Sequence, residues 1–137
     1  MKITSHAFGN NSKIPSKYTC VGENINPPLE FFDIPGNTKS LVLIMDDPDA
    51  PMGTFIHWVL YNIDPKEKEI KENSIPKSSI QGLNSMNKSE YAGPCPPSGT
   101  HRYFFKLYAL DSILEQFPEK MGEHIISQAE LIGLYSK

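Results

Sequence analysis

Three stretches of apolar residues predict the strands that carry the chemistry of this chain. Leu41 to Met45 is a continuous apolar run of strand length. A short proline-rich turn follows it, and a second strand is expected from Phe55 to Ile63. Both faces of this second strand are largely apolar, so we expect it to be central in a sheet and covered on both sides. Tyr103 to Leu110 is the clearest strand by composition, and extending it back to His101 places His101 and Tyr103 on one face.

The remaining pattern predicts shorter strands and loops. Met1 to Phe8 and Leu29 to Phe32 have strand composition, and Asn10 to Ser16 is rich in turn-forming residues. Tyr18 to Val21 favours extended backbone because it combines aromatic and β-branched residues. Asp64 to Gln81 is the most polar stretch of the chain, and we expect it to lie exposed on the surface.

One helix is predicted at the C-terminal end of the chain. Pro118 suits a first helical turn, and Gly133 suits a C-terminal stop. An apolar stripe of helical spacing connects them, formed by Met121, Ile125, Ala129 and Ile132. The sum is one mostly β domain over residues 1–137, a β-sandwich or related sheet with helical cover at the C-terminus.

Composition narrows the class of protein without naming a function. The 137 residues are 39 % apolar and 21 % charged, as in soluble globular domains. The net charge is -3 and the basic residues are scattered, which argues against a nucleic-acid or anionic-membrane partner. No apolar run approaches the roughly 20 residues of a transmembrane helix, and the N-terminus lacks the apolar segment of a secretory signal. We therefore expect a cytoplasmic protein in which Cys20 and Cys95 are free thiols.

Ionisable residues gather in two rigid loops next to the predicted strands. The first loop reads DDPDAPMGT directly after the Leu41 strand, and the second reads GPCPPSGTHRY up to Tyr103. Prolines fix the backbone direction of both loops, and stiff loops at strand ends are a common place for binding sites. We predict that the loops face each other and form one pocket from Asp47, Asp49, His57, His101 and Tyr103.

The chemistry of these side chains points to a small anion as ligand. We expect one aspartate to cap N–H groups of its own loop and the other to orient a histidine. A carboxylate on one imidazole nitrogen fixes the tautomer and leaves the other nitrogen as a donor. Two such histidines, a tyrosine hydroxyl and backbone N–H groups of the Ser98-Gly99-Thr100 turn would make a donor-rich pocket for phosphate, sulfate or carboxylate. By strand parity Arg102 points to the opposite face, where we expect a structural ion pair.

Three other interpretations remain open at the level of sequence. An aspartate with two histidines is also a ligand set for Fe(II) or zinc. The same residues would therefore suit a metal- or His/Asp-dependent hydrolase. Cys95 beside a histidine would be a nucleophilic pair, although its position between prolines lacks the helix N-terminus that activates such thiols. Finally, Asp47 and Asp49 could serve only as turn caps, with His57 as a hydrogen-bonded core histidine.

At these residues the sequence resembles the phosphatidylethanolamine-binding protein (PEBP) family, also called the Raf kinase inhibitor-like family, and it is most similar to the bacterial and archaeal branch. The DPDAP motif of that family matches Asp47 to Pro51, and its HWV-type strand matches His57 to Val59. Its GPCPPSG-x-HRY motif matches Gly93 to Tyr103. The resemblance extends over nearly the whole chain, and the two central motifs together are highly specific.

The resemblance implies a PEBP-like fold with a large central antiparallel sheet, a smaller second sheet and C-terminal helical cover. It also implies a pocket for phosphate, acetate or a phosphorylethanolamine headgroup, and relatives that modulate kinases or proteases and are often homodimers. Because no positioned nucleophile accompanies the pocket, we expect a binding protein rather than an enzyme, without a metal or cofactor. The ligand-binding residues predicted in this way are Asp47, Asp49, Pro51, His57, Gly93, Pro94, Ser98, Gly99, His101 and Tyr103.

Overall fold

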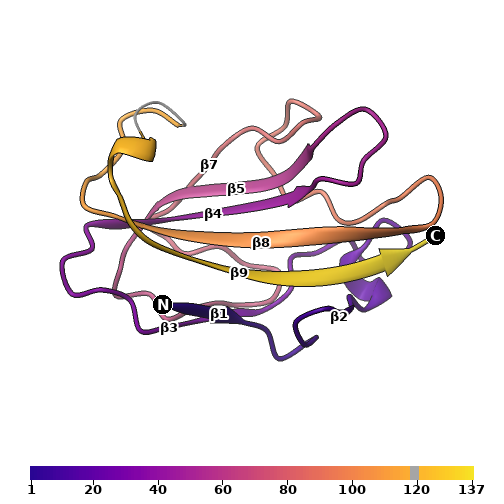
Figure 1. The fold of residues 1–137 in the computed structure, drawn as a ribbon, viewed down its shortest axis with the longest axis horizontal. Helices are drawn as coiled ribbons and strands as arrows, with labels where there is room; N and C mark the ends of the chain where they lie inside the picture. The colour runs from indigo at the N-terminus through magenta and orange to yellow at the C-terminus, as the bar shows by residue number, and fades with distance from the viewer. Residues whose placement is uncertain (118–120) are drawn as a thin grey trace.

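Two β-sheets make up the fold among residues 1–117 and 121–137, which the computed structural model describes. The strands are β1 (Lys2–Thr4), β2 (Ser12–Lys13), β3 (Leu29–Phe32), β4 (Ser40–Asp47), β5 (Phe55–Ile63), β6 (Glu69–Ile70), β7 (Ile80–Gln81), β8 (Thr100–Leu110) and β9 (Ile125–Ser136). The large sheet has the strand order β2-β9-β8-β4-β5-β7, and the small sheet has the order β1-β3-β6. The long strands of the large sheet run side by side, with β1 and β3 in a separate layer beneath them (Figure 1).

The hydrophobic core fills the space between the two sheets. Leu41, Leu43 and Met45 point from one face of β4 and have no exposed surface. Residues of β5 and β8 continue this layer, and apolar side chains of β1 and β3 cover it from the other sheet. Strand pairing is antiparallel except where β2 runs parallel to β9. The prediction of a mostly β fold with one large and one small sheet is therefore confirmed.

The predicted C-terminal helix is wrong, because its residues form β9. This strand pairs antiparallel with β8 along nearly its whole length. The apolar pattern was ambiguous, since the segment also alternates at strand period, with Leu131 and Tyr135 buried. Pairing decides between the two structures, because without β9 the backbone groups along one edge of β8 would lack partners.

Little helix is present in the described ranges. η1 (Ser16–Tyr18) and η2 (Met121–Glu123) are single 3-10 turns, and η1 overlaps the stretch predicted to be extended only at Tyr18. Gly133 is not a helix stop, because it lies within β9, and a Cβ at this position would clash with the side chain of Ile14. Close packing of β9 therefore requires glycine there. Pro118, the predicted helix start, lies outside the described residues.

The prediction that Phe55 to Ile63 is covered on both sides is confirmed, but its predicted central place in the sheet is wrong. β5 pairs with β4 along its length but with β7 only at Leu60 and Tyr61, so β4 and β8 hold the centre. The second apolar face of β5 is covered by a separate, smaller cluster of apolar side chains. Tyr61 stacks on Phe117 at a centroid distance of 5.6 Å, in a small cluster on the outer side of the sheet.

The polar stretch Asp64 to Gln81 is largely exposed, as predicted. Ile70 of β6 is only 1 % exposed and packs into the core, which attaches this excursion to the small sheet. Within the described part of the chain, no helix has the length and apolar character needed to cross a membrane.

Candidate functional site

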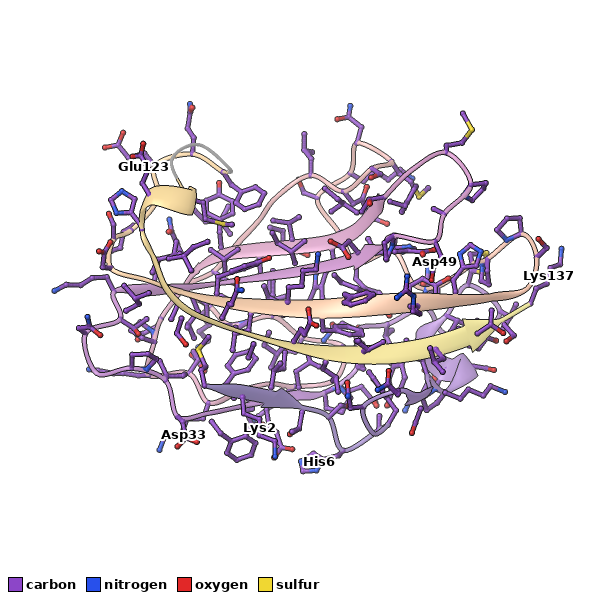
Figure 2. The ribbon with its side chains drawn as sticks, viewed as in Figure 1. Lys2, His6, Asp33, Asp49, Glu123 and Lys137 are labelled. Carbon is purple, nitrogen blue, oxygen red and sulfur yellow. A yellow bond between two sulfur atoms is a disulfide. The ribbon has the colours of Figure 1, made fainter. Side chains whose placement is uncertain are left out.

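A cavity of about 190 Å³ opens where β4 ends and β8 begins, at one end of the large sheet. Figure 2 places Asp49, next to this cavity, at the same end of the molecule as the C-terminal Lys137. The lining comes from the β4–β5 loop and β5, from the segment that leads into β8, and from β8 itself. Its residues are Asp47, Ala50, Pro51, Phe55, His57, Met86, Ala92, Gly93, Cys95, Pro96, Pro97, His101 and Tyr103.

Strand parity and one β-bulge bring the polar side chains into this cavity. Asp47 ends β4 on the core-facing side of that strand. The register between β4 and β5 passes from a pair at Trp58 to a pair at Ile56, which leaves His57 as an extra residue on β5. The bulge turns the imidazole toward the side of Trp58, whereas simple alternation would place it on the opposite face.

Asp47 holds His101 and its own loop at the same time. Its Oδ2 lies 2.6 Å from Nδ1 of His101, and its Oδ1 accepts the N–H of Asp49 at 2.8 Å. Asp47 is 3 % exposed and His101 is 7 % exposed, so water competes little for either contact. Because a carboxylate only accepts, Nδ1 of His101 carries the hydrogen, and Nε2 is the nitrogen left for a ligand. An aspartate orients a histidine, as predicted, but the predicted division of roles between two aspartates is wrong, because Asp47 also caps its own loop.

His57 is held in the same tautomer by a different partner. Its Nδ1 lies 2.6 Å from the carbonyl oxygen of Ala92, a group that can only accept. Burial lowers the pKa of His57 below its ordinary value of 6.5, although the Ala92 carbonyl and Asp47 act to raise it. The ring packs against Phe55 and Tyr103, at centroid distances of 4.7 Å and 5.3 Å. His57 is therefore neutral at neutral pH, with Nε2 as a hydrogen-bond acceptor.

Tyr103 contributes a buried hydroxyl to the cavity. The residue has no exposed surface, and its hydroxyl has no hydrogen-bond partner among residues 1–117 and 121–137. Burial raises the pKa of Tyr103, so the phenol keeps its proton and remains a donor. A buried hydroxyl without a partner is costly, so a ligand that accepts its hydrogen bond would be stabilised at this point.

Asp49, predicted to line the pocket, lies outside the cavity lining. Its carboxylate binds the Arg102 guanidinium in a bidentate pair, with Oδ1 to Nη2 and Oδ2 to Nε both at 2.9 Å. The backbone N–H of Arg102 also donates to Oδ2. The hydrogen bonds from Arg102 lower the pKa of Asp49 to about 2. The ion pair predicted for Arg102 is confirmed, and Asp49 fixes the loop instead of facing the cavity.

The structure brings together most of the predicted site residues but not all. Besides Asp49, the predicted residues that do not line the cavity are Pro94, Ser98 and Gly99. The Pro94 carbonyl accepts the N–H of Cys20 at 3.1 Å, and the Gly99 carbonyl accepts the N–H of Lys137 at 3.2 Å. These two positions therefore hold the loop, and Ser98 is exposed. The predicted residues inside the lining are Asp47, Pro51, His57, Gly93, His101 and Tyr103.

Sequence reasoning missed the apolar wall of the cavity. Ala50, Cys95, Pro96 and Pro97 belong to the two matched motifs, so the motifs taken whole would have included them. Phe55, Met86 and Ala92 gave no signal, because an apolar residue beside a polar motif looks like ordinary core. The cavity therefore joins a polar base to an apolar wall, as small-molecule sites commonly do.

Cys20 and Cys95 form a disulfide, so the prediction of free thiols is wrong. Their Cα atoms lie 5.5 Å apart although 75 residues separate them in the sequence, and a spacing of this length gives no sign of contact. The bond ties the cavity loop to the segment after η1. Backbone packing is tight there, since a Cβ on Gly93 would lie 2.4 Å from the Tyr18 carbonyl oxygen. With its sulfur in a disulfide, Cys95 is not available as the nucleophilic thiol considered above.

The metal-site interpretation lacks a ligand set in the part of the chain that the structure describes. Asp47 and His101 are hydrogen-bonded to each other. No group of three or more His, Cys, Asp and Glu side chains in residues 1–117 and 121–137 is placed to hold a metal ion.

Comparison with known sequences gives matches over nearly the full length. A family model described as phosphatidylethanolamine-binding protein matches residues 4–136. The UPF0098 protein of Methanothermobacter thermautotrophicus is 48 % identical over 150 residues, which cover 100 % of this chain and 99 % of that protein. The UPF0098 protein of Chlamydia trachomatis serovar D is 45 % identical, also over 150 residues, with 100 % and 99 % covered.

Solved structures show the same fold. The crystal structure of a phosphatidylethanolamine-binding protein homolog from Chlamydia trachomatis is 43 % identical, with a TM-score of 0.93, and the match covers 99 % of this chain and 97 % of that one. The Escherichia coli protein YbcL, described as a new member of the mammalian PEBP family, is 25 % identical with a TM-score of 0.90, covering 99 % and 98 %. Motifs, fold and full-length similarity agree, and the chain belongs to the phosphatidylethanolamine-binding protein family.

Proposed function

We propose that this protein is a non-enzymatic binding protein for a small anion, either a phosphorylated group of the phosphorylethanolamine type or a carboxylate. One observation carries the proposal. His57, His101 and Tyr103 line one cavity, and among residues 1–117 and 121–137 neither the Nε2 atoms of the two rings nor the Tyr103 hydroxyl has a hydrogen-bond partner. Three polar atoms without protein partners at one concave site indicate a ligand that would bind them.

The anion would be held by the polar base and shielded by the apolar wall. The Tyr103 hydroxyl donates one hydrogen bond, and an imidazole Nε2 donates another when its ring is protonated. The wall, which includes Phe55, Pro51 and Pro97, keeps water away, and polar contacts are stronger where water is excluded. An organic group attached to the anion would lie against this wall.

Isothermal calorimetry with inorganic phosphate and with phosphorylethanolamine tests this proposal. Wild-type protein should bind at least one of them saturably, and His101→Ala should weaken that binding by about tenfold or more. His6→Ala is the matched control, because His6 is exposed and lies outside the cavity. Absence of binding by the wild type would refute the proposal, and equal binding by His101→Ala would place the ligand elsewhere.

We also propose that the pocket serves to modulate a kinase or a protease, as the family resemblance implies. Exposed apolar side chains support contact with a protein surface: Met86, which lines the cavity, is 55 % exposed, and Met52 in the β4–β5 loop is 98 % exposed. A panel of purified kinases and proteases, assayed with wild type and His101→Ala, checks this role. A homodimer remains a prediction, and sedimentation velocity measures it.

A hydrolase that uses the same residues is the second candidate, and the Asp47–His101 pair is the observation that favours it. A histidine oriented by a buried carboxylate is the arrangement that activates a nucleophile in many hydrolases. The cavity lining offers no serine or threonine, so water would have to be the nucleophile. Release of nitrophenol from p-nitrophenyl phosphate by the wild type, lost in His101→Ala, would establish this activity and contradict the non-enzymatic proposal.

A further inference from the structure

We infer that the pocket selects anions that carry a proton of their own, such as hydrogen phosphate or the monoanion of a phosphate monoester, over anions that carry none, such as sulfate. The inference rests on the proposed function and names the ligand class more narrowly. It follows from the direction of the hydrogen bonds behind the two imidazole rings. His57 and His101 are the residues that set the selectivity.

Both rings use Nδ1 to donate to the protein. The Nδ1 of His57 faces the Ala92 carbonyl at 2.6 Å, and the Nδ1 of His101 faces the Asp47 carboxylate at 2.6 Å. Neither oxygen carries a hydrogen, so each neutral ring has its hydrogen on Nδ1 and a lone pair on Nε2. With both rings neutral, the cavity therefore presents two acceptors and only one side-chain donor, the Tyr103 hydroxyl.

A proton on the ligand turns this arrangement from repulsive to attractive. A phosphate O–H would donate to one Nε2, while the other phosphate oxygens accept from Tyr103. Sulfate has no proton near neutral pH, so its oxygens would face two lone pairs unless a ring takes up a proton. A site with unpaired buried acceptors discriminates against a ligand that lacks the matching donor, and the expected ratio is about tenfold or more.

The surroundings of His57 make protonation of its ring costly. The charged and titratable groups that act on it are Asp46 and Asp47 on β4 and His101 on β8, and the Tyr103 ring packs against it. The carboxylates favour a charged ring, whereas burial and His101 oppose it, and burial dominates. Selectivity for phosphate should therefore be large at about pH 7.5. It should shrink as pH falls, because the His57 ring then acquires a proton and becomes a donor.

The experiment is a calorimetric comparison of phosphate and sulfate at about pH 7.5 and about pH 5.5. The proteins are wild type, His57→Gln and His101→Gln, with His6→Gln as the control outside the cavity. A glutamine amide supplies a permanent N–H donor where the histidine supplies a lone pair. The wild type and His6→Gln should prefer phosphate by about tenfold or more at the higher pH, and the cavity variants should reduce the ratio to about threefold or less.

A second readout separates the inference from the proposed function. Nitrogen-15 NMR of the imidazole rings in the ligand-free protein should show the Nδ1–H tautomer for both His57 and His101. The Nε2–H tautomer would overturn the inference even if phosphate binds, as would equal wild-type affinities for phosphate and sulfate. If neither anion binds a protein with the expected tautomers, the proposed function fails and the inference falls with it.

Discussion

Asp47 and Asp49 stand two residues apart in one motif, and their environments differ sharply. Asp47 is 3 % exposed and divides its oxygens between the His101 ring and the Asp49 N–H. Asp49 lies outside the cavity and gives its oxygens to Arg102, whose side chain is 52 % exposed. One carboxylate therefore positions a group of the binding site, and the other fixes the loop from outside.

The difference shows that location in the sheet, more than residue type, decides the role of a carboxylate. Asp47 is the last residue of β4 and still follows the core-facing side of that strand, so its charge must be matched by buried partners. Asp49 is in the turn beyond the strand, where water screens its ion pair. Mutations should therefore have large effects on the Asp47 side and small effects on the Asp49 side.

The largest effect is expected from the disulfide of Cys95, which lines the same cavity as Asp47. Cys20→Ser combined with Cys95→Ser should lower the free energy of unfolding by about 2–4 kcal/mol, because the long loop it closes is no longer restrained in the unfolded chain. Urea denaturation measures this change. Dithiothreitol should destabilise the wild type by a similar amount and leave the double variant unchanged. Equal stability of both proteins would show that the bond is not formed in solution.

Asp47→Asn should cost about 1–3 kcal/mol of unfolding free energy and weaken phosphate binding. Two donors face the carboxylate of Asp47, whereas an asparagine side chain offers only one oxygen. The NH2 group of the asparagine would therefore point at a second donor, either the His101 Nδ1–H or the Asp49 N–H. Asp49→Asn is the matched variant and should leave phosphate affinity unchanged. Urea denaturation and calorimetry on both variants check this. Equal effects at the two positions would contradict the different roles assigned to Asp47 and Asp49.

His57, which lines the same cavity as Asp47, should make the free energy of unfolding depend on pH. The pKa of His57 is lower in the folded protein than its ordinary value of 6.5, so the unfolded chain binds a proton more readily. Stability is complete above about pH 6.5 and declines as pH falls toward the folded pKa. Urea denaturation between about pH 8 and pH 5 should show this loss in the wild type. His57→Gln should have a flatter profile, and an unchanged profile in this variant would assign the loss to another group.

The smallest effect belongs to the Asp49–Arg102 pair. The pKa of Asp49 falls from 3.8 to about 2 on folding, so its stabilising effect is present above 3.8 and lost as pH drops through about 2. The pair is largely exposed, and screening reduces its contribution well below that of Asp47. Asp49→Asn should be slightly less stable than wild type near neutral pH and equal to it below about pH 2. Added salt should narrow the difference, and a difference that salt leaves intact would indicate a buried pair.

The parts of the fold that could be predicted are those in which one local pattern had one interpretation. The apolar run before Asp47 and the aromatic-rich stretch after His101 lead to β4 and β8, and both are strands. The β9 segment was mispredicted because Ile125 and Ala129 fit a helical stripe while Leu131 and Tyr135 fit a strand. The segment forms a strand because β8 would otherwise have an unpaired edge. That edge exists only in the tertiary structure and is not visible in the local sequence.

The site was predictable as a motif but not as a geometry. Asp47, His57, His101 and Tyr103 do meet in one cavity. The bulge at His57 and the distant partner of Cys95 depend on how strands pair and loops meet, which local sequence does not encode. The hydrogen-bond directions behind the imidazoles are likewise set by tertiary contacts, and they leave Nε2 of each ring as an acceptor whenever that ring is neutral.

Histidine NMR during a phosphate titration of metal-free protein tests the central claim most directly. The ring signals of His57 and His101 should move together and saturate, while those of the exposed His6 stay fixed, and His101→Ala should abolish the response of His57. Ring signals of the wild type that do not move with added phosphate would contradict the account of this cavity as an anion-binding site.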